Sequence, residues 1–145
     1  MFKHIMIAFD TGESSSHAVN VGVRLAVENE ARLGLIYVAA PPVGYISESA
    51  LAAQRVLDDE RYRAQSLFKE IRSRVPDTID ITQFRPEGDP ADEIVAAATK
   101  WGADLIVVGT HGAGRFGSFL LGSTAQSVIR KAHGPVLVVR NPWTE

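Results

Sequence analysis

Short apolar runs alternate along the chain with longer segments whose apolar positions recur every three or four residues. A continuous apolar run predicts a strand buried on both faces, and a run that alternates apolar with polar residues predicts a half-exposed strand. The pattern therefore predicts five strands, the third of the half-exposed kind. They span Ile5 to Phe9, Leu33 to Val38, Ile79 to Phe84, Asp104 to Gly109 and Val136 to Arg140.

Four helices are predicted between these strands, because the apolar positions there have helical spacing. The helices begin at Ser15, cover Ala50 to Arg74, begin again at Pro90, and cover Ser123 to Ala132. We expect Ser14 or Ser15 to cap the first helix. Asp89 is expected to cap the third, with Pro90 in its first turn.

Strict alternation of strand and helix implies parallel strands joined by right-handed crossovers. We expect one α/β domain over residues 1–145. It is a doubly wound, Rossmann-like sheet of five parallel strands in the order 3-2-1-4-5, with four helices on its two faces. Such sheets bind ligands beyond the carboxyl ends of their strands. Candidate ligand-binding residues therefore lie in three segments, Asp10 to Gly12, Val38 to Val43 and Gly109 to Ser123.

The composition limits what such a domain can do. The chain has 145 residues, 46% of them hydrophobic, and no cysteine, which excludes disulfide scaffolds, thiolate metal sites and thiol nucleophiles. The chain has a net charge of −2, so it has no excess of basic residues of the kind typical of proteins that bind nucleic acids or anionic membranes. No apolar run suits a membrane helix or a signal peptide. We therefore expect a cytoplasmic protein with no nucleic-acid or membrane partner.

The clearest candidate for chemistry is the glycine-rich loop between the fourth strand and the fourth helix. Gly109, Thr110 and Gly112 follow the strand, and Gly122, Ser123 and Thr124 open the helix. Glycines let backbone N–H groups approach an anion, and a helix N-terminus adds donors and partial positive charge. Arg115 in the loop can reach a terminal phosphate as a bidentate partner. Glycines alone also fit a tightly packed turn, but the order of elements favours a phosphate site.

Two other nucleotide motifs fit this loop less well. Gly112, Gly114 and Gly117 satisfy the dinucleotide pattern G-x-G-x-x-G. That motif needs a helix beginning inside it and an acid for the ribose hydroxyls, and no acid occurs between Asp104 and Glu145. A P-loop is excluded because its lysine has no counterpart nearby. A nicotinamide or flavin enzyme is therefore disfavoured.

The loop resembles the G-x2-G-x9-G-[ST] signature of the ATP-binding universal stress proteins. Gly109, Gly112, Gly122 and Ser123 reproduce its spacing, and the resemblance extends over nearly the whole chain. It implies ATP, with Mg²⁺, bound across the strand ends.

The resemblance also implies a part of the nucleotide for each candidate residue. Asp10 and the backbone of Val38 correspond to the adenosine end, Gly109 and Gly112 to the ribose and phosphates, and Gly122, Ser123 and Thr124 to the phosphates. Thr110 and Arg115 complete the candidate set. Gly12 departs from the family, which often has serine there, so one hydroxyl contact is missing.

Several of these residues also have purely structural explanations. Asp10 can close the turn after the first strand with its side chain. His111 is expected to be a solvated loop residue, and the other histidines form no ligand cluster. No catalytic residue and no metal site is therefore predicted. Any ATP hydrolysis would be slow and would depend on positioning.

We interpret the chain as an ATP-binding regulatory protein of the stress response. Two alternatives are a nucleotide-free interaction scaffold of the same fold and a weak ATPase. Val136, Leu137, Val138 and Val139 form an apolar last strand, which is expected at the sheet edge, where unpaired backbone groups invite pairing. The resemblance implies a homodimer in which two such strands pair antiparallel across a twofold axis.

Overall fold

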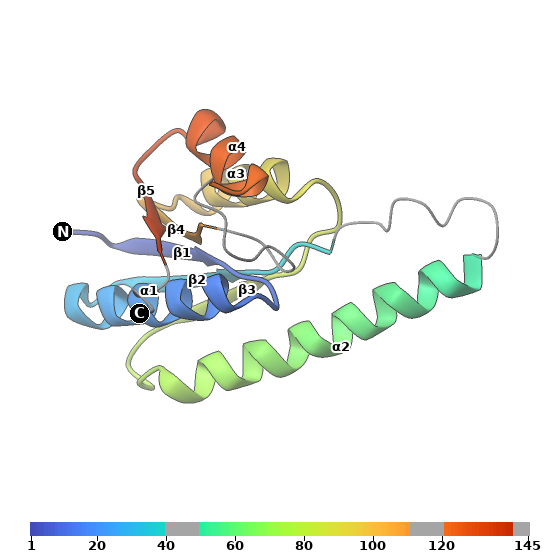
Figure 1. Cartoon of the computed structure of the whole chain (residues 1–145). Coiled ribbons are helices and arrows are strands. Elements are labelled where there is room, and N and C mark those ends of the chain that lie inside the picture. The colour runs from blue at the N-terminus through green and yellow to red at the C-terminus, as the bar shows by residue number, and fades with distance from the viewer. Residues whose placement is uncertain (40–49, 111–120, 141–145) are drawn as a thin grey trace, which may run out of the picture.

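Within the described part of the chain, a five-stranded parallel sheet lies in the middle and has two helices on each face (Figure 1). The computed structural model describes residues 1–39, 50–110 and 121–140. The strands lie in the order β3-β2-β1-β4-β5, and every neighbouring pair is parallel. The predicted fold is therefore confirmed: a doubly wound α/β sheet with the strand order 3-2-1-4-5.

Strands and helices alternate through the described residues as predicted. The strands are β1 (His4–Ala8), β2 (Arg32–Ile36), β3 (Ile81–Phe84), β4 (Leu105–Gly109) and β5 (Val136–Val139). The helices are α1 (Glu13–Asn29), α2 (Ala50–Arg74), α3 (Pro90–Trp101) and α4 (Ser123–Lys131). Where these ends differ from the predicted ones, they differ by one or two residues, as element ends commonly do.

Each face of the sheet has its own apolar cluster. Helices α1 and α2 pack on one face, where Phe68 is fully buried, and α3 and α4 pack on the other, where Ile94 is buried. Ile5 and Ile7 of β1 belong to the first cluster and Met6 belongs to the second. Because both faces of β1 are covered, its residues form a continuous apolar run and not an alternating one.

Helix α1 starts earlier than predicted and lacks the predicted serine cap. Its N-cap is Gly12, which makes no side-chain cap hydrogen bond. The Ser14 hydroxyl instead accepts the Thr110 N–H at 2.9 Å, and the Ser15 hydroxyl accepts the Asp10 N–H at 2.6 Å. Both serines are buried. The cap prediction is wrong because these hydroxyls tie the helix to the ends of β1 and β4.

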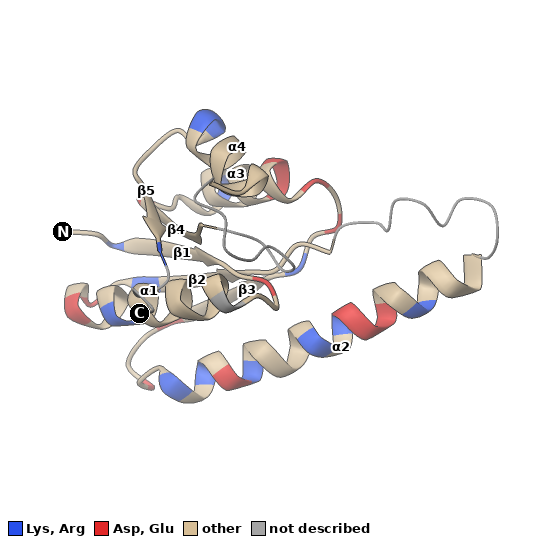
Figure 2. Cartoon of the chain, in the orientation of Figure 1, with Lys and Arg blue, Asp and Glu red and all other residues tan. Residues whose placement is uncertain are grey.

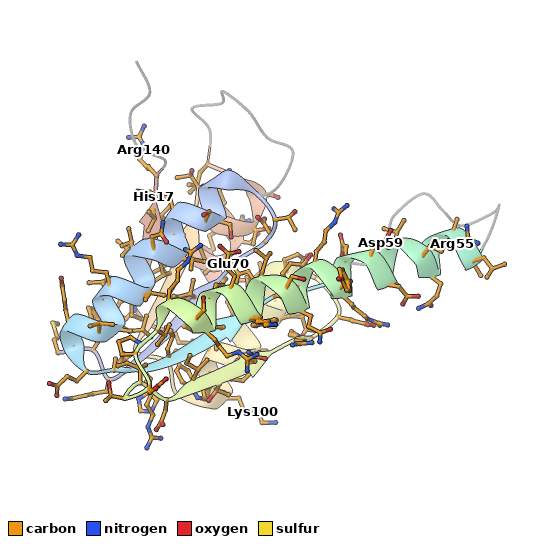
Figure 3. All side chains as sticks on the ribbon, turned by 90° about the horizontal axis from the view of Figure 1, so that it is seen from below. His17, Arg55, Asp59, Glu70, Lys100 and Arg140 are labelled. Atoms are coloured by element: carbon orange, nitrogen blue, oxygen red, sulfur yellow. The ribbon has the colours of Figure 1, made fainter. Side chains whose placement is uncertain are left out.

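Helix α2 packs on the sheet through its C-terminal half. Its buried residues are Ala64, Phe68 and Ile71, and no described side chain before Ala64 is buried. Figures 1 and 3 show the N-terminal half, which carries Arg55 and Asp59, extending beyond the sheet. Charges of both signs are interspersed along this helix (Figure 2). None of the described helices is long and apolar enough to span a membrane.

Candidate functional site

A cavity of about 360 Å³ opens at the carboxyl end of the sheet, where β1, β2 and β4 end. Ligands of open α/β sheets bind at this edge, and small-ligand sites commonly measure about 300–1,000 Å³. Part of the lining is apolar and includes Ala8, Ile36, Val38, Ile94, Val108 and Ala125. A polar part includes Asp10, Thr11, Ser15, Gly109, Thr110 and Thr124. The cavity therefore suits a ligand with both an apolar ring and a polar portion.

Most of the predicted site residues converge on this cavity. Five line it: Asp10, Val38, Gly109, Thr110 and Thr124. Gly122 and Ser123 begin α4 next to Thr124 but are not part of the lining. Gly112, Arg115 and His111 lie outside the described residues.

The turn between β1 and α1 is closed by hydrogen bonds around Asp10. The Gly12 N–H donates to Oδ1 of Asp10 at 2.7 Å, and the Asp10 N–H donates to the Ser15 hydroxyl at 2.6 Å. Asp10 therefore closes the turn with its side chain, which was the structural explanation for this residue. Asp10 also lines the cavity. A carboxylate has several acceptor sites, so the turn and a ligand can both use it.

The backbone of Val38 lies where β2 separates from β1. The ladder between these strands ends with the Phe9 N–H donating to the Ile36 carbonyl at 3.1 Å. The next rungs would use the N–H and C=O of Val38, and neither group has a hydrogen-bond partner within the described residues. In an extended strand both groups of one residue point to the same side. Val38 therefore presents one donor and one acceptor beside the apolar part of the cavity.

Gly109 is required for packing as well as lining the cavity. A β-carbon at this position would lie 2.7 Å from Oγ of Ser14 and 2.9 Å from the Ser14 carbonyl oxygen. Ser14 is held there because its hydroxyl accepts the Thr110 N–H and lies 3.1 Å from the Thr110 hydroxyl. The Thr110 side chain is thus engaged with α1. The missing side chain at Gly109 lets α1 approach the end of β4.

Gly109→Ala is expected to lower the free energy of unfolding by about 1–3 kcal/mol, because the added methyl group meets backbone atoms that cannot move independently. Urea unfolding followed by circular dichroism measures the change. Gly134→Ala is the matched control, since a β-carbon there meets nothing within 4 Å, and it should change stability by less than about 0.5 kcal/mol. Equal stability of the two variants would contradict this packing role for Gly109.

Two helix N-termini without side-chain caps adjoin the cavity. α1 and α4 begin after glycine N-caps, Gly12 and Gly122, and neither has a side-chain cap hydrogen bond. α3 differs, because Asp89 accepts the Asp92 N–H at 3.0 Å, which confirms the predicted cap. The first N–H groups of a helix have no acceptor within it and carry partial positive charge. Because Thr124 lies in the first turn of α4 and lines the cavity, this helix end can bind an anion there.

Two polar residues of the cavity were not predicted. Tyr37 follows β2, and Glu60 projects from α2. Burial, together with the carboxylates of Glu60 and Asp10, raises the pKa of the Tyr37 phenol to about 12, so this group keeps its proton and remains a hydrogen-bond donor. No group of three or more metal-binding side chains occurs within residues 1–39, 50–110 and 121–140.

The chain is similar in sequence to known proteins over nearly its whole length. A model of the universal stress protein family matches residues 1–140. Universal stress protein MJ0531 of Methanocaldococcus jannaschii is 36% identical over 148 residues, which cover 100% of this chain and 86% of the relative. A universal stress protein of Thermus aquaticus is 36% identical over 143 residues, which cover 97% of this chain and 100% of the relative.

Solved structures of universal stress proteins are also similar to this chain in fold. MJ0577 of M. jannaschii matches with a TM-score of 0.83 and 25% identity, over 99% of both chains. A universal stress protein in complex with cAMP matches with a TM-score of 0.71 and 27% identity, over 95% of this chain and 97% of that one. UspA from Lactobacillus plantarum, at 22% identity and a TM-score of 0.84, shares the fold over 95% of this chain and 97% of its own. The chain belongs to the universal stress protein family.

Proposed function

We propose that this protein binds an adenine nucleotide, ATP, at the carboxyl end of its sheet and acts as a nucleotide-dependent regulatory module of the stress response. One observation carries the proposal: a single cavity joins an apolar lining to the first turn of α4, which has no side-chain cap. An apolar lining accommodates a base, and an uncapped helix N-terminus accommodates phosphate.

The backbone of Val38 supports recognition of adenine in particular. Adenine presents an amino donor at N6 beside an acceptor at N1 on one edge of its ring. The C=O and N–H of Val38 complement that pair, and neither has another partner within the described residues. Unpaired polar groups beside an apolar wall gain most from a ligand that satisfies both of them.

The phosphates are expected at the N-terminus of α4, which carries partial positive charge. Thr124 brings the first turn of α4 to the cavity, and no acidic residue occupies that turn. Gly122, Ser123 and Gly112 remain predicted phosphate contacts on the basis of the family signature. Arg115 remains one because its guanidinium can bind a terminal phosphate with two hydrogen bonds. Mg²⁺ would be bound mainly by the phosphates, as this ion commonly is in nucleotide sites, with few protein ligands.

The cAMP complex of a related universal stress protein, which is 27% identical to this chain, supports an adenine nucleotide as the ligand class. The titratable side chains in the described lining are Asp10, Tyr37 and Glu60. None of them is an evident base for activating water next to α4. We therefore propose a binding function, with at most slow hydrolysis of ATP.

Adenine recognition by Val38 predicts that ATP binds at least about 10-fold more tightly than inosine triphosphate. Inosine carries a carbonyl acceptor in place of the amino donor and a protonated N1, so both hydrogen bonds to Val38 would be lost. Equilibrium dialysis of the two nucleotides under identical Mg²⁺ concentrations measures the ratio. Equal affinities would show that Val38 does not contact the edge of the base.

We also propose that two copies associate through β5, the edge strand next to β4. The Ile106 N–H donates to the Pro135 carbonyl at 3.1 Å, and Val108 lies opposite Val138. In a parallel pair, the N–H and C=O of alternate residues point toward the neighbouring strand. Since the Pro135 carbonyl faces β4, the backbone groups of Val136 and Val138 point away from β4. These outward groups can pair antiparallel with the same groups of a second copy.

A further inference from the structure

A second cavity, of about 440 Å³, lies between α2 and the segment that follows β3. We refer to it as the α2 cleft. Helix α2 contributes Asp58, Arg61 and Tyr62, and the segment after β3 contributes Arg85 and Glu87. It lies toward the half of α2 that extends past the sheet in Figures 1 and 3. The proposed nucleotide function assigns no role to these residues.

The two carboxylates of the α2 cleft are both paired with Arg61. Arg61 forms an ion pair with Glu87, and a second one with Asp58 at 3.7 Å. Arg61 therefore bridges α2 to the segment after β3. Arg61, Asp58 and Glu87 together carry a net charge of −1. Arg85 brings the total for these four residues to zero.

Arg85 forms no ion pair within the part of the chain that the structure describes. Its guanidinium lies over the ring of Phe68, 4.7 Å from the ring centroid. The hydrogen bond that it donates to Oε1 of Gln83 is long, at 3.4 Å. The Phe68 ring thus holds a guanidinium at the wall of the cleft, and most of its N–H donors remain available to an anion.

Aromatic rings provide two further parts of the wall. The Tyr62 side chain is large and apolar, yet Tyr62 is 74% exposed. Tyr37 also lines the cleft, is buried and keeps its phenolic proton. Because Tyr62 and Arg85 line the same cleft, a flat ring that stacks on Tyr62 can carry a carboxylate group that accepts hydrogen bonds from Arg85.

We propose that the α2 cleft is a second ligand site, for a planar organic anion of the aromatic carboxylate class. Arg85 would bind the carboxylate and Tyr62 would stack on the ring. Tyr37 is the one described residue that lines both cavities. The two cavities therefore have largely separate linings, and the cleft can be tested on nucleotide-free protein.

The test is a ¹⁵N–¹H NMR titration of nucleotide-free protein with indole-3-acetate, and with indole-3-acetamide as its uncharged counterpart. Indole-3-acetate is expected to give saturable shifts around Tyr62 and Arg85, with an affinity at least about 10-fold higher than that of the amide. Acetate alone should give no saturable shifts, since it has no ring to stack on Tyr62.

Variants identify the residues responsible. Arg85→Gln should lower the affinity for indole-3-acetate at least about 10-fold and make it equal to that for the amide. Arg72→Gln, an exposed arginine of α2 outside the cleft, should bind as the parent protein does. Equal binding of the acid and the amide, unchanged binding in Arg85→Gln, or no saturable shift at millimolar ligand would each overturn the proposal. Saturable binding of acetate as tight as that of indole-3-acetate would overturn the role of the ring.

Discussion

Thr124→Glu is expected to weaken Mg·ATP binding at least about 100-fold, because its carboxylate would occupy the anion site at the start of α4. Thr124 lies in the first helical turn and lines the cavity. A carboxylate placed there repels the phosphates and competes with them for the same backbone N–H groups. An acidic residue in the first turn favours the helix, so the melting temperature should stay the same or rise.

Isothermal calorimetry of Mg·ATP binding measures this effect, with Ser66→Glu as the control. Ser66 is exposed in the middle of α2 and lines neither cavity, and its substitution adds the same charge to the molecule. Affinity within about threefold of the parent protein is expected for the control, because exposed charges far from the ligand are screened by salt. If Thr124→Glu also binds at nearly the parent affinity, the phosphates do not lie at α4.

Val138→Pro is expected to convert a dimer into monomers. Proline removes the outward N–H of Val138, around which two antiparallel β5 strands would pair. The substitution leaves the bonds of β5 to β4 in place, because the register assigns those to the flanking residues. Proline is tolerated on an edge strand when its missing N–H faces outward.

Sedimentation velocity measures the oligomeric state, and far-UV circular dichroism checks that the fold is retained. Val138→Thr keeps the outward N–H and the branched side chain, so this variant should remain a dimer. A charged residue at position 138 is a less specific test, because Val138 also packs against the cluster under α3 and α4. A folded Val138→Pro variant that stays dimeric would place the interface elsewhere.

The arrangement of the fold followed from the sequence because each element depends on a local pattern. The buried central strands are continuous apolar runs, and α2 keeps helical spacing up to Arg74. The N-cap of α1 could not be predicted in this way, because the Ser14 and Ser15 hydroxyls bind backbone groups at the ends of β4 and β1. Tertiary hydrogen bonds of this kind leave no signature in a local pattern.

The candidate site was predictable to a lesser degree. The glycine spacing and the strand ends led to Asp10, Val38 and Thr124, all of which line one cavity. Gly109 was interpreted as a ligand contact, and the structure adds a packing requirement imposed by Ser14. Glu60 could not be predicted, because its place beside the cavity depends on how α2 crosses the sheet.

One adenine nucleotide per chain is proposed to bind at the carboxyl end of the sheet. The most direct test is a calorimetric titration of Mg·ATP into protein that has been unfolded, freed of bound small molecules and refolded. Saturable binding with a stoichiometry of one ATP per chain is expected. Absence of saturable binding at millimolar Mg·ATP would contradict it and would favour the nucleotide-free scaffold.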